Sequence, residues 1–276
     1  MSYSHFTQRN APYVSLELQA KLRTTRVLIA GCGIGSTVAE TLVRLGCTQL
    51  TLADPDIVEL HNLNRQAFRH ADLGRLKVDA LADRLTSIWP EANIERVPHA
   101  IDAQNARELV ARVDLIIDTI DLVSVSGIVA VHDAARALQR PAVTALNIGF
   151  GAGAMVFPAG HPTSFRQAFG LPTTGTLEGA QYASFFAPVL AALAPHMDPR
   201  VVAAVAPVLA LMAEGKPCPA PQVAIGAAAV AHLASYLVLQ LVAGERVPAA
   251  PAFILYDPQR AIEAGIVALA LPQDRG

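Results

Sequence analysis

Residues 25–46, TRVLIAGCGIGSTVAETLVRLG, decide the fold, because an apolar run meets three closely spaced glycines and then an amphipathic segment. The β-branched and apolar residues at 25–31 predict a short buried strand that ends at a glycine. Residues 36–46 carry apolar side chains at helical spacing before a final glycine, which predicts a helix. A strand, a glycine loop and a helix in this order are typical of a nucleotide-binding unit.

The same alternation of strand and helix patterns continues to residue 147. Further strands are expected at residues 49–54, 93–97, 113–118 and 142–147, and further helices at 77–89, 103–111 and 125–138. This alternation predicts an α/β, Rossmann-like, mostly parallel sheet with helices on both faces. Ligands of such sheets bind at the carboxyl ends of the strands, so the function is expected in the loops there.

The sequence changes character after Phe150, where glycine and proline become frequent. We expect a strand flanked by loops within 149–164, helices at 181–193 and 200–213, a linker at 215–221, a long apolar helix at 223–243 and a last strand at 252–256. We therefore predict a first part, residues 1–157, that holds the nucleotide site. Residues 158–276 form an elaborated helical and mixed C-terminal part.

Composition excludes several classes of protein. Hydrophobic residues make up 53% of the 276-residue chain, which is enough for a sizeable core. The net charge of −2 indicates no basic face that would bind nucleic acid. The three cysteines, Cys32, Cys47 and Cys218, form no CxxC pair, so neither a structural zinc site nor a disulfide framework is expected. A polar N-terminus without an apolar stretch predicts no signal peptide, and we expect a cytoplasmic protein.

The helix expected at 223–243 is about long enough to cross a bilayer. It contains His232 and Gln240, and much of its apolar character comes from alanine. These features favour a buried core or dimer-interface helix over a membrane span.

The glycine loop itself predicts a phosphate site. Gly31, Gly33 and Gly35 allow the backbone to turn tightly and to approach a phosphate, and the helix that follows offers free N–H groups. Asp54, at the end of the second strand, is placed to bind ribose hydroxyls. Close packing of strand and helix is the alternative reason for the glycines. The loop does not choose between ATP, NAD, FAD and S-adenosylmethionine.

Residues 52–77, LADPDIVELHNLNRQAFRHADLGRLK, discriminate between these ligands. Many polar and charged residues follow the second strand, and a dehydrogenase has no need for such a cluster at this place. Arg65 can hold phosphate oxygens in a planar fork, Lys77 can supply a point charge, and Asn62 can bond near the α-phosphate. The segment therefore favours chemistry on a triphosphate.

This segment resembles the DxDxVExxNLxRQ…GxxK signature of the ThiF/MoeB/ubiquitin-activating family of adenylyltransferases. The matching residues are Asp54, Asp56, Val58, Glu59, Asn62, Leu63, Arg65, Gln66, Gly74 and Lys77. The resemblance implies a fold that binds ATP and magnesium, usually as a homodimer. It also implies a reaction in which a C-terminal carboxylate attacks the α-phosphate of ATP and gives an acyl-adenylate.

Two further segments are similar to the family pattern. Residues 118–121, DTID, resemble its DxxDN motif, which implies that Asp121 binds magnesium, although Leu122 stands where the family has asparagine. Arg9 resembles an arginine that reaches the γ-phosphate in the partner subunit's site. A helix cap is the alternative role for Asp121. A thioester role for Cys218 is a further possibility that the resemblance raises, with a bystander as the alternative.

We therefore expect residues 1–157 to be an ATP-binding adenylyltransferase domain, and residues 158–276 to serve the substrate side and dimerisation. The expected partner is a small ubiquitin-like or sulfur-carrier protein, or a peptide, with a free C-terminus. Neither nucleic acid nor a membrane is expected as a partner. The alternatives are a nucleotide-binding scaffold without activity, and an NAD-dependent oxidoreductase or methyltransferase.

Overall fold

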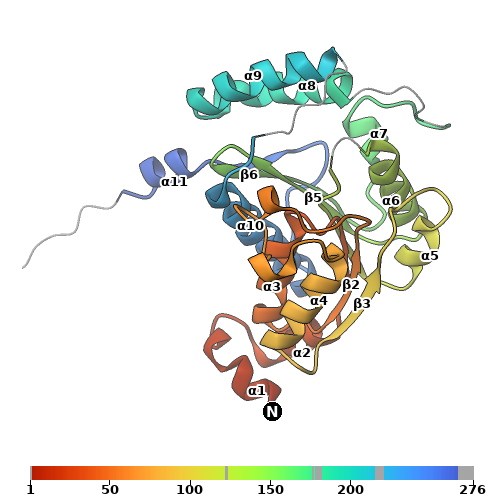
Figure 1. Cartoon of the computed structure of the whole chain (residues 1–276), viewed down its shortest axis with the longest axis vertical. Coiled ribbons are helices and arrows are strands. Elements are labelled where there is room, and N and C mark those ends of the chain that lie inside the picture. The colour runs from red at the N-terminus through yellow and green to blue at the C-terminus, as the bar shows by residue number, and fades with distance from the viewer. Residues whose placement is uncertain (1, 122–123, 176, 178–181, 215–220, 267–276) are drawn as a thin grey trace, which may run out of the picture.

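A computed structural model describes residues 2–121, 124–175, 177, 182–214 and 221–266 of the chain. Its centre is one seven-stranded sheet in the order β3-β2-β1-β4-β5-β6-β7 (Figure 1). The strands are β1 (Arg26–Ala30), β2 (Gln49–Ala53), β3 (Asn93–Val97), β4 (Leu115–Asp118), β5 (Ala142–Ile148), β6 (Gly151–Phe157) and β7 (Ile254–Tyr256). The first five strands in this order are parallel, and β6 and β7 are antiparallel to their neighbours. The mostly parallel sheet that the sequence predicts is confirmed.

Helices cover both faces of the sheet. Successive residues of the central strands point to opposite faces, and because these residues are apolar, both faces must be buried. On one face lie α2 (Leu16–Thr24), α3 (Gly35–Leu45), α4 (Lys77–Ile88) and α10 (Ala224–Ala243). On the other lie α5 (Ala106–Ala111) and α6 (Val125–Ala137). Neighbouring residues Leu28 and Ile29 of β1 face opposite layers, and both are fully buried. This double burial explains why β1 reads as a continuous apolar run.

The long apolar helix α10 packs against α3, β5 and β6 and is part of the main core. It is long and apolar enough to cross a membrane by composition alone, and 56% of that stretch is buried within the protein. Of the two roles expected for this helix, a core helix or a dimer-interface helix, its packing agrees with the first. Strand β7 pairs with β6, so the region 158–276 contributes one strand to the sheet and helix α10 to a layer that covers it.

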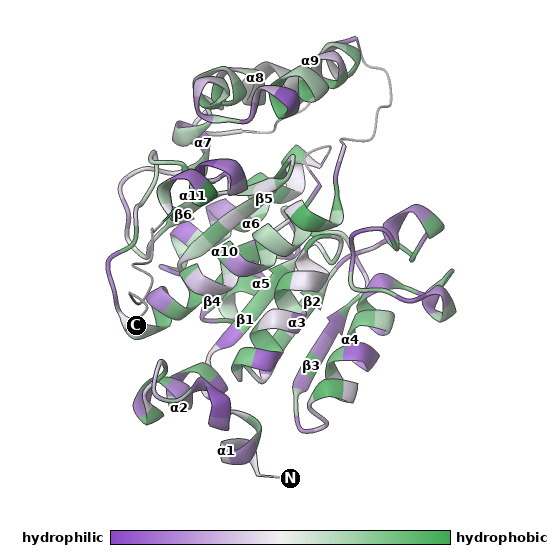
Figure 2. Cartoon of the chain, turned by 90° about the vertical axis from the view of Figure 1, so that its left-hand side faces the viewer, coloured by the Kyte–Doolittle hydropathy of each residue, from purple (hydrophilic) through white to green (hydrophobic). Residues whose placement is uncertain are grey.

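Remaining helices extend the fold at its ends. They are α1 (Tyr3–Phe6), α7 (Phe165–Ala168), α8 (Tyr182–Leu193), α9 (Pro199–Ala213) and α11 (Pro258–Ala264). Helices α8 and α9 lie side by side at one end of the molecule (Figure 2). The N-terminal segment packs against the rest of the protein: Phe6 stacks on Trp89 at 4.7 Å between ring centroids.

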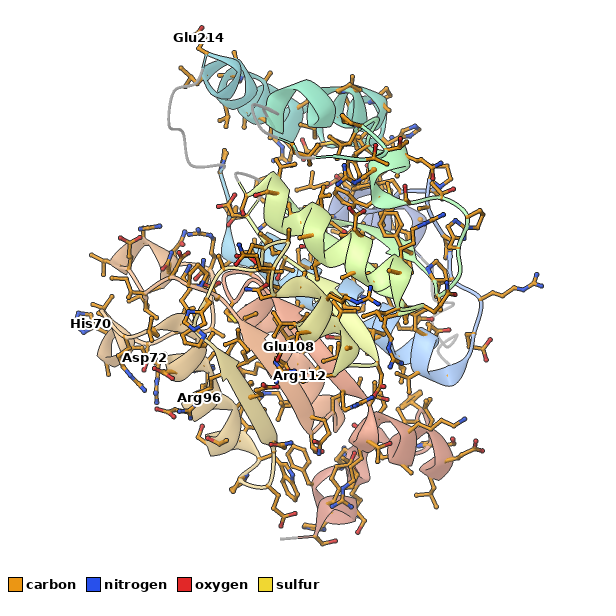
Figure 3. The ribbon with its side chains drawn as sticks, turned by 90° about the vertical axis from the view of Figure 1, so that its right-hand side faces the viewer. His70, Asp72, Arg96, Glu108, Arg112 and Glu214 are labelled. Carbon is orange, nitrogen blue, oxygen red and sulfur yellow. The ribbon has the colours of Figure 1, made fainter. Side chains whose placement is uncertain are left out.

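Charged side chains lie mainly on the outer surface, where they form ion pairs between neighbouring elements. Asp72 and Arg96 lie on the β3 and α4 side of the molecule, and Glu108 and Arg112 lie on the α5 side (Figure 3). Asp72 is an exception, since its side chain is buried between Arg69 and Arg75. Burial alone would raise the pKa of Asp72, but hydrogen bonds from Arg69 hold it below its ordinary value. This cluster anchors the end of the 52–77 segment.

Candidate functional site

Three loops meet at the carboxyl edge of the sheet, after β1, β2 and β4. The backbone N–H of Gly31 donates to Ala53 at the end of β2, at 2.9 Å, and that of Thr119 donates to Ala30 at the end of β1, at 2.8 Å. The glycine loop therefore lies between the 52–77 segment and the turn that follows β4. All of the predicted site residues except Arg9 belong to these three loops and their adjoining elements.

The three glycines of the loop have different surroundings. A Cβ at Gly31, whose φ is +88°, would lie 2.5 Å from the carbonyl oxygen of Thr119, and one at Gly35 would lie 2.5 Å from its hydroxyl. Close packing against the β4 turn explains these two. A Cβ at Gly33 would meet only the side chain of Gln66, at 3.2 Å, so close packing does not explain this glycine. Helix α3 begins here without a side-chain cap.

Asp54 closes the base of this loop. Its side chain is buried, and Oδ2 accepts a hydrogen bond from the N–H of Cys32 at 2.6 Å, while Oδ1 accepts one from the N–H of Asp56 at 2.8 Å. Burial raises the pKa of Asp54 above its ordinary value, although the positive charge of Lys77 opposes the shift. The carboxylate thus joins the glycine loop to the segment after β2.

Lys77 brings a positive charge to the same place. Only 9% of its side chain is exposed, and Nζ lies 2.7 Å from Oδ2 of Asp56. Its backbone N–H donates to the carbonyl of Asp56 at 2.8 Å, which fixes the start of α4 beside the end of β2. The structure therefore brings Lys77, Asp54 and Asp56 together beside the glycine loop, while their roles toward a nucleotide stay predictions.

Arg65 is held by a different set of partners. Its Nε donates to Oε1 of Gln222 at 2.5 Å and its Nη1 donates to the carbonyl of His61 at 2.8 Å. Burial lowers the pKa of Arg65, and the negative charge of Asp121 opposes that shift. Arg65 and Asp121 are therefore close enough to interact, although they are 56 positions apart in the chain. Gln222, which the sequence reasoning did not single out, holds the arginine in place.

Asn62 and Arg9 occupy positions that differ from the rest. Asn62 is buried, and its Oδ1 accepts a hydrogen bond from the N–H of Glu59 at 2.9 Å, so its amide oxygen shapes the loop. Arg9 is exposed in a short 3₁₀ helix (Gln8–Asn10), and the adjacent Asn10 donates to the carbonyl of Leu45 at 3.0 Å. That is the C-terminal end of α3, about 16 Å from its start at the glycine loop. Within one protomer, the structure does not bring Arg9 to the site.

The DTID motif covers the end of β4 and the turn after it, and its two aspartates differ in environment. Asp121 is exposed. Asp118 is buried, and its carboxylate accepts hydrogen bonds from the side chains of His132 and Thr144. Neither of these partners was predicted, and a polar residue within an otherwise apolar helix or strand was the available signal. Leu122 and Cys218 lie outside the described residues.

Comparisons with known proteins identify the family of the chain. The ThiF family model matches residues 6–270. The chain is 34% identical over 145 residues to the sulfur carrier protein ThiS adenylyltransferase of Escherichia coli, covering 52% of this chain and 57% of that protein. It is 33% identical over 165 residues to the adenylyltransferase and sulfurtransferase MOCS3 of Sus scrofa, covering 58% and 35%.

Among solved structures, Escherichia coli MccB with ATP superimposes with a TM-score of 0.61 at 20% identity, covering 84% of this chain and 60% of that one. At this identity the likeness concerns the fold. The chain spans 57% and 35% of the length of these two curated relatives. The family match covers nearly the whole chain, and with it the glycine loop, the 52–77 segment and the β4 turn. The chain belongs to the ThiF family.

Proposed function

We propose that this chain is an ATP- and magnesium-dependent adenylyltransferase. Its substrate would be the C-terminal carboxylate of a small ubiquitin-like or sulfur-carrier protein, or of a peptide. The observation that carries the proposal is that Lys77 and Asp54 lie together beside the glycine loop, and that Arg65 lies close enough to Asp121 for their charges to interact. The names of the curated relatives, a ThiS adenylyltransferase and MOCS3, support the same reaction class.

The loop fits a nucleotide. Gly33 leaves room that a Cβ would fill, and the uncapped start of α3 offers backbone N–H groups to an anion. Asp54 retains acceptor capacity for ribose hydroxyls beyond its two backbone hydrogen bonds. Lys77 and Arg65 then lie on two sides of a triphosphate, each with a carboxylate that balances its charge before the nucleotide binds.

Magnesium would be held mainly by the phosphates of ATP. No group of three or more His, Cys, Asp or Glu side chains that could hold a metal occurs among the described residues. Magnesium in nucleotide sites commonly uses one or two carboxylates together with phosphates and water, and the exposed carboxylate of Asp121 fits that role. When bound, the ion would neutralise negative charge on the phosphates.

The reaction needs orientation and charge more than proton transfer. A carboxylate is already ionised at neutral pH, so its oxygen attacks the α-phosphorus without a general base. The new bond joins that oxygen to phosphorus, and the bond between the α-phosphorus and the bridging oxygen breaks, so that pyrophosphate leaves with the electron pair. Lys77 and Arg65 would stabilise the charge that develops on the leaving group.

ATP–pyrophosphate exchange with candidate carrier proteins tests the proposal. Arg65→Ala and Asp121→Ala are expected to lower the exchange rate by about a hundredfold each, because each removes one charged contact in the site. Arg44→Ala is the matched control, since Arg44 is an exposed arginine that pairs with Glu40 on α3. Exchange that survives both site substitutions unchanged would rule out these roles. Tight ATP binding without exchange would favour a nucleotide-binding scaffold.

A homodimer is part of the proposal, because Arg9 lies at the far end of α3 and is exposed. An arginine in that place reaches a triphosphate only in another protomer's site. Light scattering with size-exclusion chromatography measures the oligomeric state. In a dimer, mixing Arg9→Ala with Lys77→Ala protomers would restore part of the exchange that either variant loses alone. A monomer with full exchange activity would contradict the cross-subunit role.

A further inference from the structure

Three buried polar side chains form a closed network directly beneath the turn that carries Asp121. Asp118 ends β4, His132 lies in α6 and Thr144 lies in β5, and their exposed fractions are 1%, 5% and 3%. His132 Nε2 lies 3.0 Å from Oδ2 of Asp118, and the hydroxyl of Thr144 lies 3.1 Å from the same oxygen and 2.9 Å from Nε2. Burying such groups costs stability unless they bond to one another, and here they do.

The second oxygen of Asp118 holds the turn itself. Oδ1 accepts a hydrogen bond from the N–H of Ile120 at 3.1 Å, and Ile120 immediately precedes Asp121. The hydroxyl of Thr119 donates to the carbonyl of Gly31 at 2.7 Å, which ties the same turn to the glycine loop. One carboxylate therefore links α6 and β5 to the backbone that presents Asp121.

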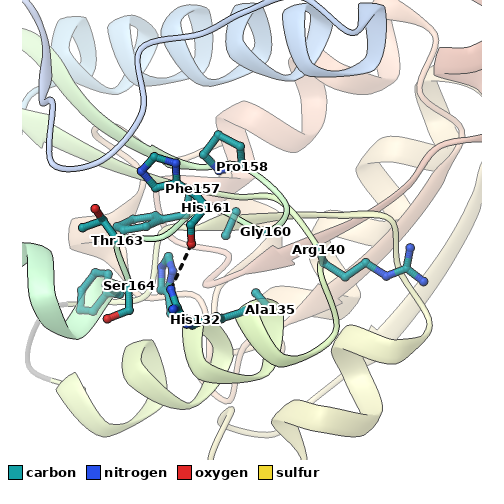
Figure 4. A pocket seen from close by; sticks show the side chains of 12 residues that line it. His132, Ala135, Arg140, Phe157, Pro158, Gly160, His161, Thr163 and Ser164 are labelled. Atoms are coloured by element: carbon teal, nitrogen blue, oxygen red, sulfur yellow. Dashed lines mark hydrogen bonds between the residues drawn. The ribbon is translucent and has the colours of Figure 1, made fainter. Parts of the chain in front are cut away.

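The imidazole of His132 is held in one orientation by two aromatic rings. It stacks on Phe165 at 4.4 Å between centroids and lies edge-on to Phe157 at 4.9 Å. A small cavity borders this histidine, and His161 and Ser164 lie on its wall (Figure 4). With the imidazole proton on Nε2, the ring donates to Oδ2 of Asp118 across this 3.0 Å contact.

The arginines on the cavity wall have partners of their own. Arg136 donates to the backbone carbonyls of His161 and Pro162, at 3.1 and 2.9 Å. Arg140 lies 3.7 Å from the carboxylate of Asp114. These arginines therefore do not bond to the carboxylate of Asp118. Its side-chain partners in the described part of the chain are His132 and Thr144.

We propose that His132 and Thr144 are positioning residues for the metal-binding aspartate. They hold Asp118 so that its other oxygen fixes the backbone at Ile120, and this fixed backbone aims Asp121 at the phosphates. The part that concerns magnesium rests on the proposed function, whereas the fixing of the turn does not.

Two measurements on the full chain test the inference separately. The first is hydrogen exchange at the Ile120 amide. His132→Leu and Thr144→Val should speed this exchange about tenfold or more, because each removes a hydrogen bond to a charged group. His132→Gln keeps an N–H near the position of Nε2 and should stay near the wild-type rate. Thr51→Val is the matched control, since Thr51 is a buried strand threonine whose hydroxyl bonds to Glu95, away from the turn.

The second measurement is the magnesium dependence of binding of a non-hydrolysable ATP analogue, by calorimetry. The magnesium concentration for half-maximal effect should rise about tenfold in His132→Leu and Thr144→Val, the size typical for loss of a residue that orients a metal ligand. Analogue binding in EDTA should stay unchanged in both variants, and His132→Gln should restore the magnesium dependence. A purely structural role would weaken binding equally with and without magnesium.

Each result decides a separate point. Wild-type exchange at Ile120 in folded Thr144→Val would overturn the inference, whatever the activity of the enzyme. Faster exchange with an unchanged magnesium dependence would overturn the link to Asp121. If His132→Leu does not fold, His132→Gln and Thr144→Val carry the test. A wild-type chain without ATP–pyrophosphate exchange would defeat the proposed function and leave the exchange result at Ile120 standing.

Discussion

Replacing Gly33 with alanine separates a phosphate-binding role for the loop from a packing role. The added Cβ would lie 3.2 Å from Nε2 and 3.8 Å from Cδ of the Gln66 side chain. No backbone atom beyond its chain neighbours would lie within 4 Å of it. A shift of the amide by a few tenths of an ångström relieves this contact. We therefore expect the free energy of unfolding to change by less than about 1 kcal/mol, within the range that glycine-to-alanine changes show at compatible sites.

The effect on ATP should be much larger. A methyl group placed where phosphate oxygens approach the backbone overpacks the site, which costs about 1–3 kcal/mol. That corresponds to an affinity for ATP that is weaker by about 5- to 150-fold. Calorimetric titration with ATP, alongside thermal unfolding, measures both quantities. Gly31→Ala is the contrasting variant, because its Cβ would lie 2.5 Å from a backbone carbonyl and should destabilise the fold itself. Unchanged ATP affinity in Gly33→Ala would refute the reasoning.

Three further predictions follow from the site. Lys77→Met should lower exchange about hundredfold, yet cost only about 1 kcal/mol of stability, since its ion-pair partner is 63% exposed; denaturant titration of the variant checks this. Burial raises the pKa of Asp54 in the folded state, so the folded state binds this proton more tightly than the unfolded state does. Wild type should therefore gain stability relative to Asp54→Asn as the pH falls from above the folded pKa to the unfolded value of about 3.9. A stability difference that is constant from about pH 7 to 4 would contradict this. Burial raises the pKa of Cys47 to about 12 and that of Cys32 well above its ordinary value, so a Cys218→Ser variant should resist thiol labelling at pH 8 while folded and label fully in denaturant.

Much of the fold was predictable because its signals are local. The apolar run before Gly31 and the helical spacing after Gly35 each lie within a few residues, and they found β1 and α3 closely. The grouping of Asp54 with Lys77 was also predictable, since a parallel sheet gathers the residues that follow its strands. The docked N-terminal helices were not foreseen, because contacts such as Phe6 on Trp89 depend on distant parts of the chain.

The same reason explains what the sequence left out of the site. Gln222 lies 157 positions from Arg65, and His132 and Thr144 reach Asp118 from two different elements. No spacing rule joins these residues before the sheet is assembled. Asn62 differs from these: its contact with the α-phosphate stays a prediction, and its side-chain oxygen accepts a hydrogen bond from the N–H of Glu59 within its own loop.

A structure of the chain with bound ATP and magnesium tests the central claim most directly. The account predicts phosphate oxygens above Gly33, within hydrogen-bonding distance (about 3 Å) of both Lys77 Nζ and the Arg65 guanidinium. A nucleotide bound elsewhere, or one bound here with both cations still turned to Asp56 and Gln222 and away from its phosphates, would contradict it.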